Sequence, residues 1–395
     1  MTRLLEILIS MAIVAVLFVL VALFLPSSRT ITEQIETNRR QAIVFDTLNS
    51  LRRFDDWNAL PMRDPAVQLK LSGPDAGVGA RLDYDSDARS LGQGSWEIVE
   101  SDPDSRVLYS LENPDRGENK RMEFTLKPTG RGGRNIEITQ RYSVEYGWNL
   151  LGRYAGMYVR GHVGEDMKLG LNKLASMLAA VPNVDYRADG VSLTNLGVVD
   201  RPAENLLSVS AGAIERNNEV IKESMKSNRE WIKRTMDAND LEPAGPLRIV
   251  STELGRENYT FDVVQPVRRK GGDDADGDEA DADADADAAE EAGEEGEEAD
   301  TPAVAEAPAV DEGELDVEIP DGAPVEYIRV EAGKAARGEY VGYMAELENV
   351  RNAVRAWALT HGYEVTDRPY EFYKNGIDEA FTENGEFEVF WTLKQ

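Results

Sequence analysis

Cysteine is absent from this chain, and histidine occurs only at His162 and His361. Without cysteine the protein can form no disulfide and no thiolate metal site. Two histidines also disfavour a histidine-rich metal centre or a histidine-based catalytic network. We therefore expect neither a metal ion nor a cofactor.

Recognisable catalytic motifs are missing as well. The sequence contains no G-x-S-x-G elbow, phosphate-binding loop, H-E-x-x-H helix or dinucleotide-binding fingerprint. A glycine-rich stretch at residues 129–135 joins two strand-like segments, which is typical of a turn. Asp55 and Asp56 are adjacent, and adjacent side chains point apart, so we do not expect them to share a proton. No residue is predicted to be catalytic, and a binding protein is favoured over an enzyme.

Basic residues are outnumbered, with 43 Lys and Arg against 73 Asp and Glu, and the formal net charge is −30. Most of this charge is local, because residues 271–318 hold 22 Asp and Glu and no Lys or Arg, which leaves about −8 for the rest of the chain. Nucleic-acid binding requires a basic face against phosphates and is therefore disfavoured. The predicted partners are a small molecule and a membrane, and no protein partner is indicated.

The membrane prediction comes from the N-terminus. After Glu6, 19 largely apolar residues follow without a charge, enough to cross the hydrocarbon core of a bilayer. A cleaved signal peptide is the competing interpretation, but its apolar core is usually shorter, and residues 24–28 match a cleavage site poorly. We expect residues 1–28 to be a single-pass anchor in the cell (inner) membrane. Basic residues on its two sides do not decide which side holds the rest of the chain.

Residues 29–182 have the pattern of an α+β domain. The apolar periodicity predicts a strand at 30–37 and a helix within 39–53. Alternating segments separated by Gly, Pro and Asp then predict six strands, at 67–71, 78–84, 93–100, 106–112, 120–127 and 134–146. Residues 150–181 carry apolar residues at helical spacing, which predicts a long helix lying across an antiparallel sheet.

This order resembles the helix-grip fold of the START/Bet v 1-like (SRPBCC) superfamily, in its polyketide-cyclase-like branch. The segment VFDTLNSLRRFDDWNAL, residues 44–60, is similar to a segment of that family, with Trp57 and Asn58 at its Trp-Asn pair. The resemblance implies an elongated cavity between sheet and helix. Its candidate lining residues are Trp57, Trp96, Tyr109, Tyr142 and Tyr158, although an aromatic residue at such a position is more often part of the core.

A linker is expected at 183–191, and a second domain follows. Residues 201–212 are strand-like, 214–236 helical, and two strands follow up to residue 267. The same order returns after residue 322, with a strand and then a turn within 325–343, a helix at 344–361 and two closing strands. The sequence therefore predicts a strand–helix–strand–strand unit used twice, at 192–267 and 322–395. Between the two halves, residues 268–321 are an acidic, low-complexity insert that we expect to be disordered. A calcium site there is an alternative, but the placed glycine and glutamate of a calcium loop are missing.

The duplicated unit resembles the GyrI-like effector-binding domain. The similar features are Gly245-Pro246 and Arg368-Pro369 after the two helices, and the closing strands FDVVQPV and FEVFWTL. The resemblance implies a cleft for a small cationic or aromatic molecule, with an acidic residue on a closing strand. The matching residues are Glu388 and Asp262, and Tyr340, Tyr373 and Trp391 are candidates to stack on the ligand.

Together these features predict a membrane-tethered protein that binds or senses a small molecule and has no DNA-binding domain of its own. The alternative is an enzyme of cyclase or small-molecule hydrolase type that uses the GyrI-like cleft. A third hypothesis is an envelope scaffold in which the acidic insert is a spacer or attracts a basic partner.

Overall fold

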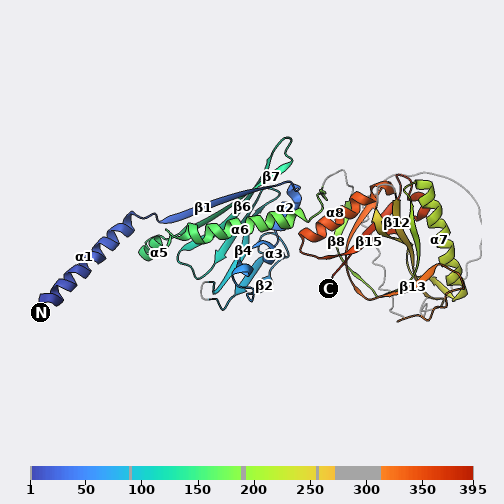
Figure 1. The fold of residues 1–395 in the computed structure, drawn as a ribbon, viewed down its shortest axis with the longest axis horizontal. Coiled ribbons are helices and arrows are strands. Elements are labelled where there is room, and N and C mark those ends of the chain that lie inside the picture. The colour runs from blue at the N-terminus through green and yellow to red at the C-terminus, as the bar shows by residue number, and fades with distance from the viewer. Residues whose placement is uncertain (1, 89–90, 188–192, 255–257, 272–312, 395) are drawn as a thin grey trace, which may run out of the picture.

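The computed structural model describes residues 2–88, 91–187, 193–254, 258–271 and 313–394. Two α+β domains follow an N-terminal helix along the long axis of the molecule (Figure 1). The predicted α+β fold, with a helix-grip sheet followed by a duplicated domain, is confirmed by the strand order described below.

The N-terminal helix α1 (Thr2–Phe24) projects from the first domain (Figure 1). Its segment Arg3–Phe24 has a mean hydropathy of 3.2, and nearly all its apolar side chains are exposed. By length and composition this helix can cross a membrane, although a signal sequence passes the same test.

The first domain contains a seven-stranded antiparallel sheet in the described part of the chain, in the order β1-β7-β6-β5-β4-β3-β2. Its strands are β1 (Ser28–Thr37), β2 (Gln68–Ser72), β3 (Arg81–Asp85), β4 (Gln93–Asp102), β5 (Arg106–Glu112), β6 (Glu118–Thr129) and β7 (Asn135–Glu145). Inward residues alternate with outward ones along β6 and β7 because one face of the sheet is buried. All seven strands lie where the sequence predicts them.

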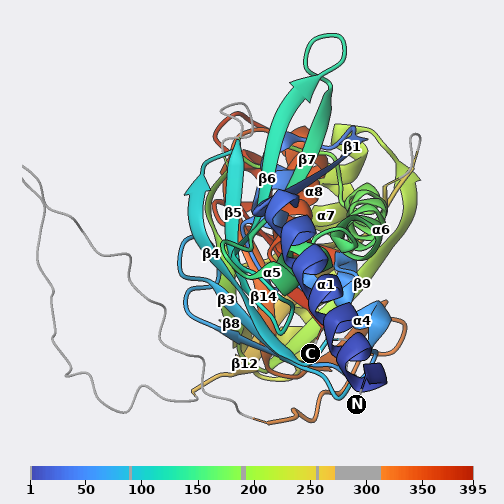
Figure 2. The same cartoon turned by 90° about the vertical axis from the view of Figure 1, so that its left-hand side faces the viewer.

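The buried face of the sheet is covered by helices (Figure 2). They are α2 (Gln41–Leu48), α3 (Phe54–Trp57), α4 (Leu60–Arg63) and α6 (Val159–Ala179), whereas α5 (Leu150–Ala155) lies at the end of the domain against α1. The predicted helix at 39–53 ends at Leu48, where Asn49 caps it. The helix predicted over 150–181 is interrupted between α5 and α6. There the chain turns around the Tyr146 ring, and a Cβ at Gly156 would lie only 2.6 Å from that ring.

The second domain has a nine-stranded sheet in the described residues, in the order β13-β9-β12-β11-β15-β16-β14-β8, with β10 paired to β12. Its strands are β8 (Leu193–Arg201), β9 (Glu204–Glu215), β10 (Leu241–Pro243), β11 (Arg248–Leu254), β12 (Asn258–Arg269), β13 (Val325–Val330), β14 (Gly333–Val341), β15 (Val365–Tyr373) and β16 (Glu386–Leu393). The helices are α7 (Asn218–Ala238), the short 3-10 helix η1 (Met344–Glu346), α8 (Leu347–Thr360) and α9 (Gly376–Glu379).

The order of these strands shows the duplication directly. β9, α7, β11 and β12 form one unit, and β14, α8, β15 and β16 form the other. The two units meet at the antiparallel pair of β11 and β15, and from there the strand order runs outward identically in both directions. The two units also exchange edge strands. β8 precedes the first unit but pairs with β14 of the second, and β13 precedes the second unit but pairs with β9 of the first. β8 lies within the predicted first unit, 192–267, but its residues before 201 were not predicted as a separate strand.

The predicted acidic insert, 268–321, lies mostly outside the described residues. At its edges the structure differs from the prediction. Arg268 and Arg269 belong to β12, and Leu315 is buried in the core of the second domain. Glu318 exchanges hydrogen bonds with Asn239 after α7, at 2.7 and 2.8 Å. The residues from 313 to 319 therefore pack on the folded domain.

The two domains touch through α2 and α8. Tyr186 from the linker donates a 2.5 Å hydrogen bond to Asp46 of α2 and lies 3.1 Å from the Thr360 hydroxyl of α8. Nearby, Arg53 donates to the Leu359 carbonyl at 3.0 Å. His361 stacks on Trp357 beside this contact, and burial lowers the pKa of its imidazole.

This His361 environment predicts a pH dependence of stability. A lowered folded-state pKa means that the unfolded chain takes up the proton first as the pH falls, so stability is present above about pH 6.5 and is lost below it. We expect the melting temperature of the full chain in detergent to fall between pH 7.5 and 5.5, and H361Q to reduce that fall. H162Q is the control, and an equal reduction with H162Q would contradict the assignment.

A buried ion pair lies at the junction of the two units. Arg351 of α8 pairs with Glu371 of β15, and their side chains are 6% and 0% exposed. Arg351 also donates to the Tyr259 hydroxyl at 3.3 Å, and its carbonyl accepts the indole N–H of Trp391 at 2.8 Å. Burial raises the pKa of Glu371, and Arg351 opposes that rise.

Removal of one partner leaves the other charge buried without compensation. We therefore expect R351M to lower the free energy of unfolding by about 3–5 kcal/mol, and the double variant R351M/E371L to recover much of the loss. Urea denaturation of the full chain in detergent measures both values. A double variant no more stable than R351M would show that the pair is not the source of the effect.

Candidate functional site

The first domain encloses a cavity of about 570 Å³ between the sheet and α6. Its walls come from α3 and α4, the strands β3 to β7, the loop between β5 and β6, and the segment from α5 into α6. The two halves of α6 differ in what their inward side chains contact. Leu174 and Leu178 in its C-terminal half are fully buried core residues, whereas His162, Val163 and Asp166 in its N-terminal half line the cavity.

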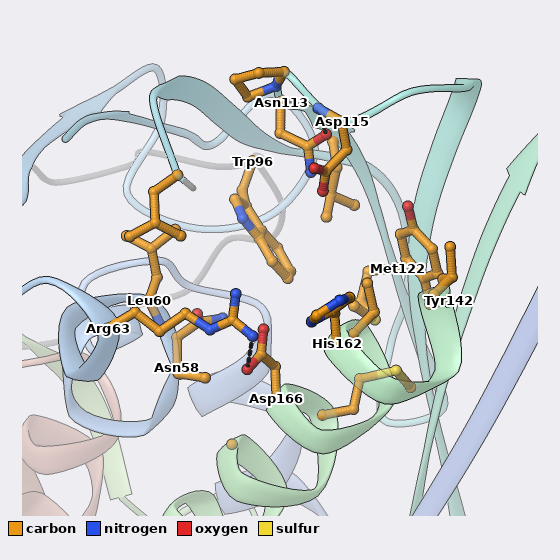
Figure 3. Close-up of a pocket in the computed structure, with 18 of the residues that line it drawn as sticks. Asn58, Leu60, Arg63, Trp96, Asn113, Asp115, Met122, Tyr142, His162 and Asp166 are labelled. Carbon is orange, nitrogen blue, oxygen red and sulfur yellow. Dashed lines mark hydrogen bonds and ion pairs between the residues drawn. The ribbon is translucent and has the colours of Figure 1, made fainter. Parts of the chain in front are cut away.

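The inner wall is mainly aromatic. Trp57 and Trp96 line it and are 2% and 7% exposed, and each packs edge-to-face on Phe54, with ring centroids 5.6 and 5.1 Å apart. Met122 and Tyr142 line the wall from β6 and β7 (Figure 3). Such a wall suits an apolar or aromatic body.

Two buried polar atoms on this wall have no hydrogen-bond partner among the described residues. One is the indole N–H of Trp57, a donor, and the other is the side-chain carbonyl oxygen of Gln140, an acceptor. The amide nitrogen of Gln140 contacts the sulfur of Met122 at 3.2 Å, which leaves only the oxygen free. Burying such atoms unpaired is costly, and both residues belong to the lining of the cavity.

The rim of the cavity carries the charges. Arg63 of α4 pairs with Asp166 of α6 at 2.6 Å, and His162 lies one turn before Asp166 on the same helix face (Figure 3). Burial raises the pKa of Asp166, and Arg63 partly counteracts the rise. Burial also raises the pKa of the Tyr84 phenol, on the cavity wall, to about 12. The tyrosine therefore stays neutral and can donate a hydrogen bond.

The loop over the rim is held in place by one lysine. Lys120 is 5% exposed and donates to the Asn113 carbonyl at 2.9 Å, the Asn113 side chain at 2.5 Å and the Asp115 carbonyl at 2.6 Å. Burial lowers the pKa of this ammonium group. Its bonds fix the main chain of the loop that forms one side of the opening.

Four of the five residues predicted to line this cavity do so: Trp57, Trp96, Tyr142 and Tyr158. Tyr109 does not. It is fully buried, packs between Trp96 and Phe124, and donates its hydroxyl to the Leu48 carbonyl. Four further lining residues were not predicted from the sequence: Arg63, Gln140, His162 and Asp166. The i,i+4 spacing of His162 and Asp166 was the available signal, because it places both on one helix face.

The residues predicted for the second domain do not form one site. Glu388 lies on the sheet face opposite the helices, where it pairs with Arg337 at 2.9 Å and Lys374 at 3.1 Å. Asp262 has the orientation of Glu388 but lies three strands away, which is about 14 Å at the usual strand spacing.

The three aromatic candidates point to the other face. Tyr340, Tyr373 and Trp391 belong to the core between sheet and helices, with Tyr340 stacked on Phe387 at 6.0 Å. They cannot stack on a ligand held by Glu388. The aromatic residues on the Glu388 face are instead Tyr370, Phe372 and Phe390, with the Arg248 guanidinium 4.8 Å from the centre of the Phe372 ring.

No group of three or more His, Cys, Asp and Glu side chains within the described residues could hold a metal ion. Neither a protein-family model nor a curated protein sequence matches this chain.

Several solved structures are similar to part of it. Truncated norcoclaurine synthase from Thalictrum flavum has 12% identity and a TM-score of 0.31, over 39% of this chain and 94% of that chain. A protein from Nitrosospira multiformis has 13% identity and a TM-score of 0.30, over 38% and 97% of the two chains. A protein from Chromobacterium violaceum has 14% identity and a TM-score of 0.28, over 38% and 96%. TM-scores this low carry no argument about function.

The unpartnered oxygen of Gln140 leads to a stability prediction. We expect Q140L, which keeps a similar volume, to raise the free energy of unfolding of the unliganded full chain by about 1 kcal/mol, because a buried unpaired acceptor is removed. Urea denaturation in detergent measures this change. Q34L, on the exposed part of β1, is the control and should leave stability within about 0.5 kcal/mol. A destabilised Q140L would show that the oxygen is paired.

Proposed function

We propose that this chain is a membrane-tethered protein that binds an amphipathic small molecule in the cavity of its first domain. The observation that carries the proposal is the cavity itself. It has a volume of about 570 Å³, an aromatic inner wall and a charged rim, and two of its wall residues carry a buried donor or acceptor that has no partner among the described residues. Ligand pockets in proteins have this combination of a largely apolar lining with a few placed polar groups.

The ligand properties follow from the positions of these groups. An apolar or aromatic body would lie against Trp57, Trp96 and Met122 in the interior. A group that both accepts and donates hydrogen bonds would lie beside Trp57 and Gln140, whose buried indole N–H and side-chain oxygen have no partner among the described residues. Polar atoms would remain at the rim, near Arg63 and His162. The helix-grip arrangement supports assignment of this domain to the START/Bet v 1-like superfamily.

The membrane tether in this proposal is α1. Its length of 23 residues and its exposed apolar surface support a span that stays attached to the mature protein. An uncleaved α1 would place the binding domain within a few residues of the cell (inner) membrane.

The second domain is proposed to be of the GyrI-like type, supported by its duplicated units and exchanged edge strands. Glu388 remains its candidate ligand-binding residue. In the described structure it is neutralised by Arg337 and Lys374, so a cationic ligand would have to compete with both. The first domain therefore provides the better supported site.

Catalysis is the second candidate function, favoured by Asp166. Its pKa is raised by burial at the rim of a cavity, with His162 nearby, and such a pair can transfer protons.

A cavity-filling variant tests the binding function. We expect V163W, which places a large ring in the cavity, to weaken binding of the fluorescent probe 11-(dansylamino)undecanoic acid about tenfold, equivalent to 1.4 kcal/mol. The full chain is held in amphipol, and the titration follows dansyl emission.

The matched control is L169W on the exposed side of α6, which should bind the probe as the unmodified chain does. Equal binding by V163W and the unmodified chain would contradict the cavity as the site. Chemical conversion of an added ligand that is lost in D166N would instead support the catalytic function.

A further inference from the structure

The segment Trp148–Tyr158, which includes α5, carries an apolar surface at one end of the first domain. Trp148 is 83% exposed, Tyr158 66%, Leu151 54% and Met157 46%. Large apolar side chains gathered on one short segment indicate an interaction site, in contrast to single exposed ones.

This surface is continuous with α1. Arg153 of α5 is 9% exposed and donates to the carbonyls of Ala22, Leu23 and Leu25 at 3.2–3.3 Å, so it caps the end of the apolar helix. Tyr154 stacks on Phe18 at 4.4 Å and donates to its carbonyl at 2.9 Å. Figure 1 shows α5 at the end of the domain from which α1 projects.

These contacts set the depth of α5 if α1 spans a bilayer. Phe18 lies six residues before the end of α1, which is about 9 Å along the axis at 1.5 Å per residue. Interfacial helices bury their apolar face about 5–10 Å into the boundary between headgroups and acyl chains. Trp and Tyr are also the residues enriched at that boundary. Both the depth and the composition of the segment therefore match those of a segment at the membrane interface.

The opening of the cavity lies at the same end of the sheet. Ser28 at the start of β1 pairs with Glu145 at the end of β7, and Glu145 also pairs with Glu118 at the start of β6. The β5–β6 loop, which precedes Glu118, forms one side of the rim. Tyr158, from the apolar segment itself, also lines the cavity.

We infer that the segment Trp148–Tyr158 inserts into the interface of the membrane that holds α1 and turns the rim of the cavity toward the bilayer. The partner is a phospholipid surface, and the ligand reaches the cavity from the membrane rather than from water. This inference rests on the membrane tether of the proposed function, and it adds a second contact with the bilayer and an entry route.

Site-directed spin labelling tests the insertion, and the absence of cysteine from the chain makes single-cysteine variants simple to produce. The full chain carries a nitroxide at L151C, V78C or V14C in phosphatidylcholine vesicles. Leu151 and Val78 have similar exposures, 54% and 60%, and Val78 is outside the segment. We expect the labels at residues 14 and 151 to collide more with oxygen than with a water-soluble nickel complex, and the label at 78 to show the reverse.

The outcomes distinguish insertion of the segment Trp148–Tyr158 from the membrane tether by α1. A buried label at 14 with aqueous labels at 151 and 78 would overturn the inference and leave the tether intact. An aqueous label at 14 would overturn both. Failure of probe binding in amphipol would overturn the proposed ligand site without changing the depth at 151.

A charge substitution tests the entry route. We expect L151E to bind 11-(dansylamino)undecanoic acid in amphipol like the unmodified chain, but to lose the rapid uptake of this probe from phosphatidylcholine vesicles. V78E is the matched control and should take up the probe at the unmodified rate. Equal uptake by L151E, V78E and the unmodified chain would overturn the entry route.

Discussion

The packing of α6 against the curved sheet is the interaction on which the first domain depends. The C-terminal half of α6 buries Leu171, Leu174 and Leu178, and each such leucine contributes about 1.5–3 kcal/mol to stability. The N-terminal half packs less closely on the sheet, and the cavity lies in the space between them. Gly170 lies between the two halves, and a Cβ there would be 3.3 Å from the Trp57 carbonyl. One helix thus stabilises the domain at one end and forms a cavity wall at the other.

The two ends of the first domain face different neighbours. The end with the cavity rim lies next to α1, and α2 at the other side contacts α8 of the second domain. Contacts run from the cavity wall to α2, because Trp96 packs on Tyr109, and Tyr109 donates to the Leu48 carbonyl of α2. The first domain is therefore a structural link between the apolar helix and the duplicated domain.

Much of this architecture could be predicted from periodicity, but the sites could be predicted only in part. Alternation located six of the seven strands of the first sheet, yet it does not show whether an inward residue lines a cavity or fills the core, as Tyr109 does. In the second domain alternation also decides which predicted site residues share a face of the sheet. Trp391 is three residues after Glu388 and must point to the opposite face, whereas Phe390, two residues on, shares its face. β8 could not be predicted as an element of the second sheet, because its partner β14 lies about 140 residues later in the sequence.

The exchanged edge strands have a consequence for synthesis of the protein on the ribosome. β8 and β9 emerge early, but their partners β14 and β13 emerge only after residues 272–312 have been translated. Until then the first unit has unpaired strand edges, which are prone to pair with other chains. The acidic residues of the intervening segment reach the tunnel exit in this interval, and their like charges repel neighbouring nascent chains. Vectorial translation thus brings the most charged part of the sequence out of the ribosome while these strand edges are still unpaired.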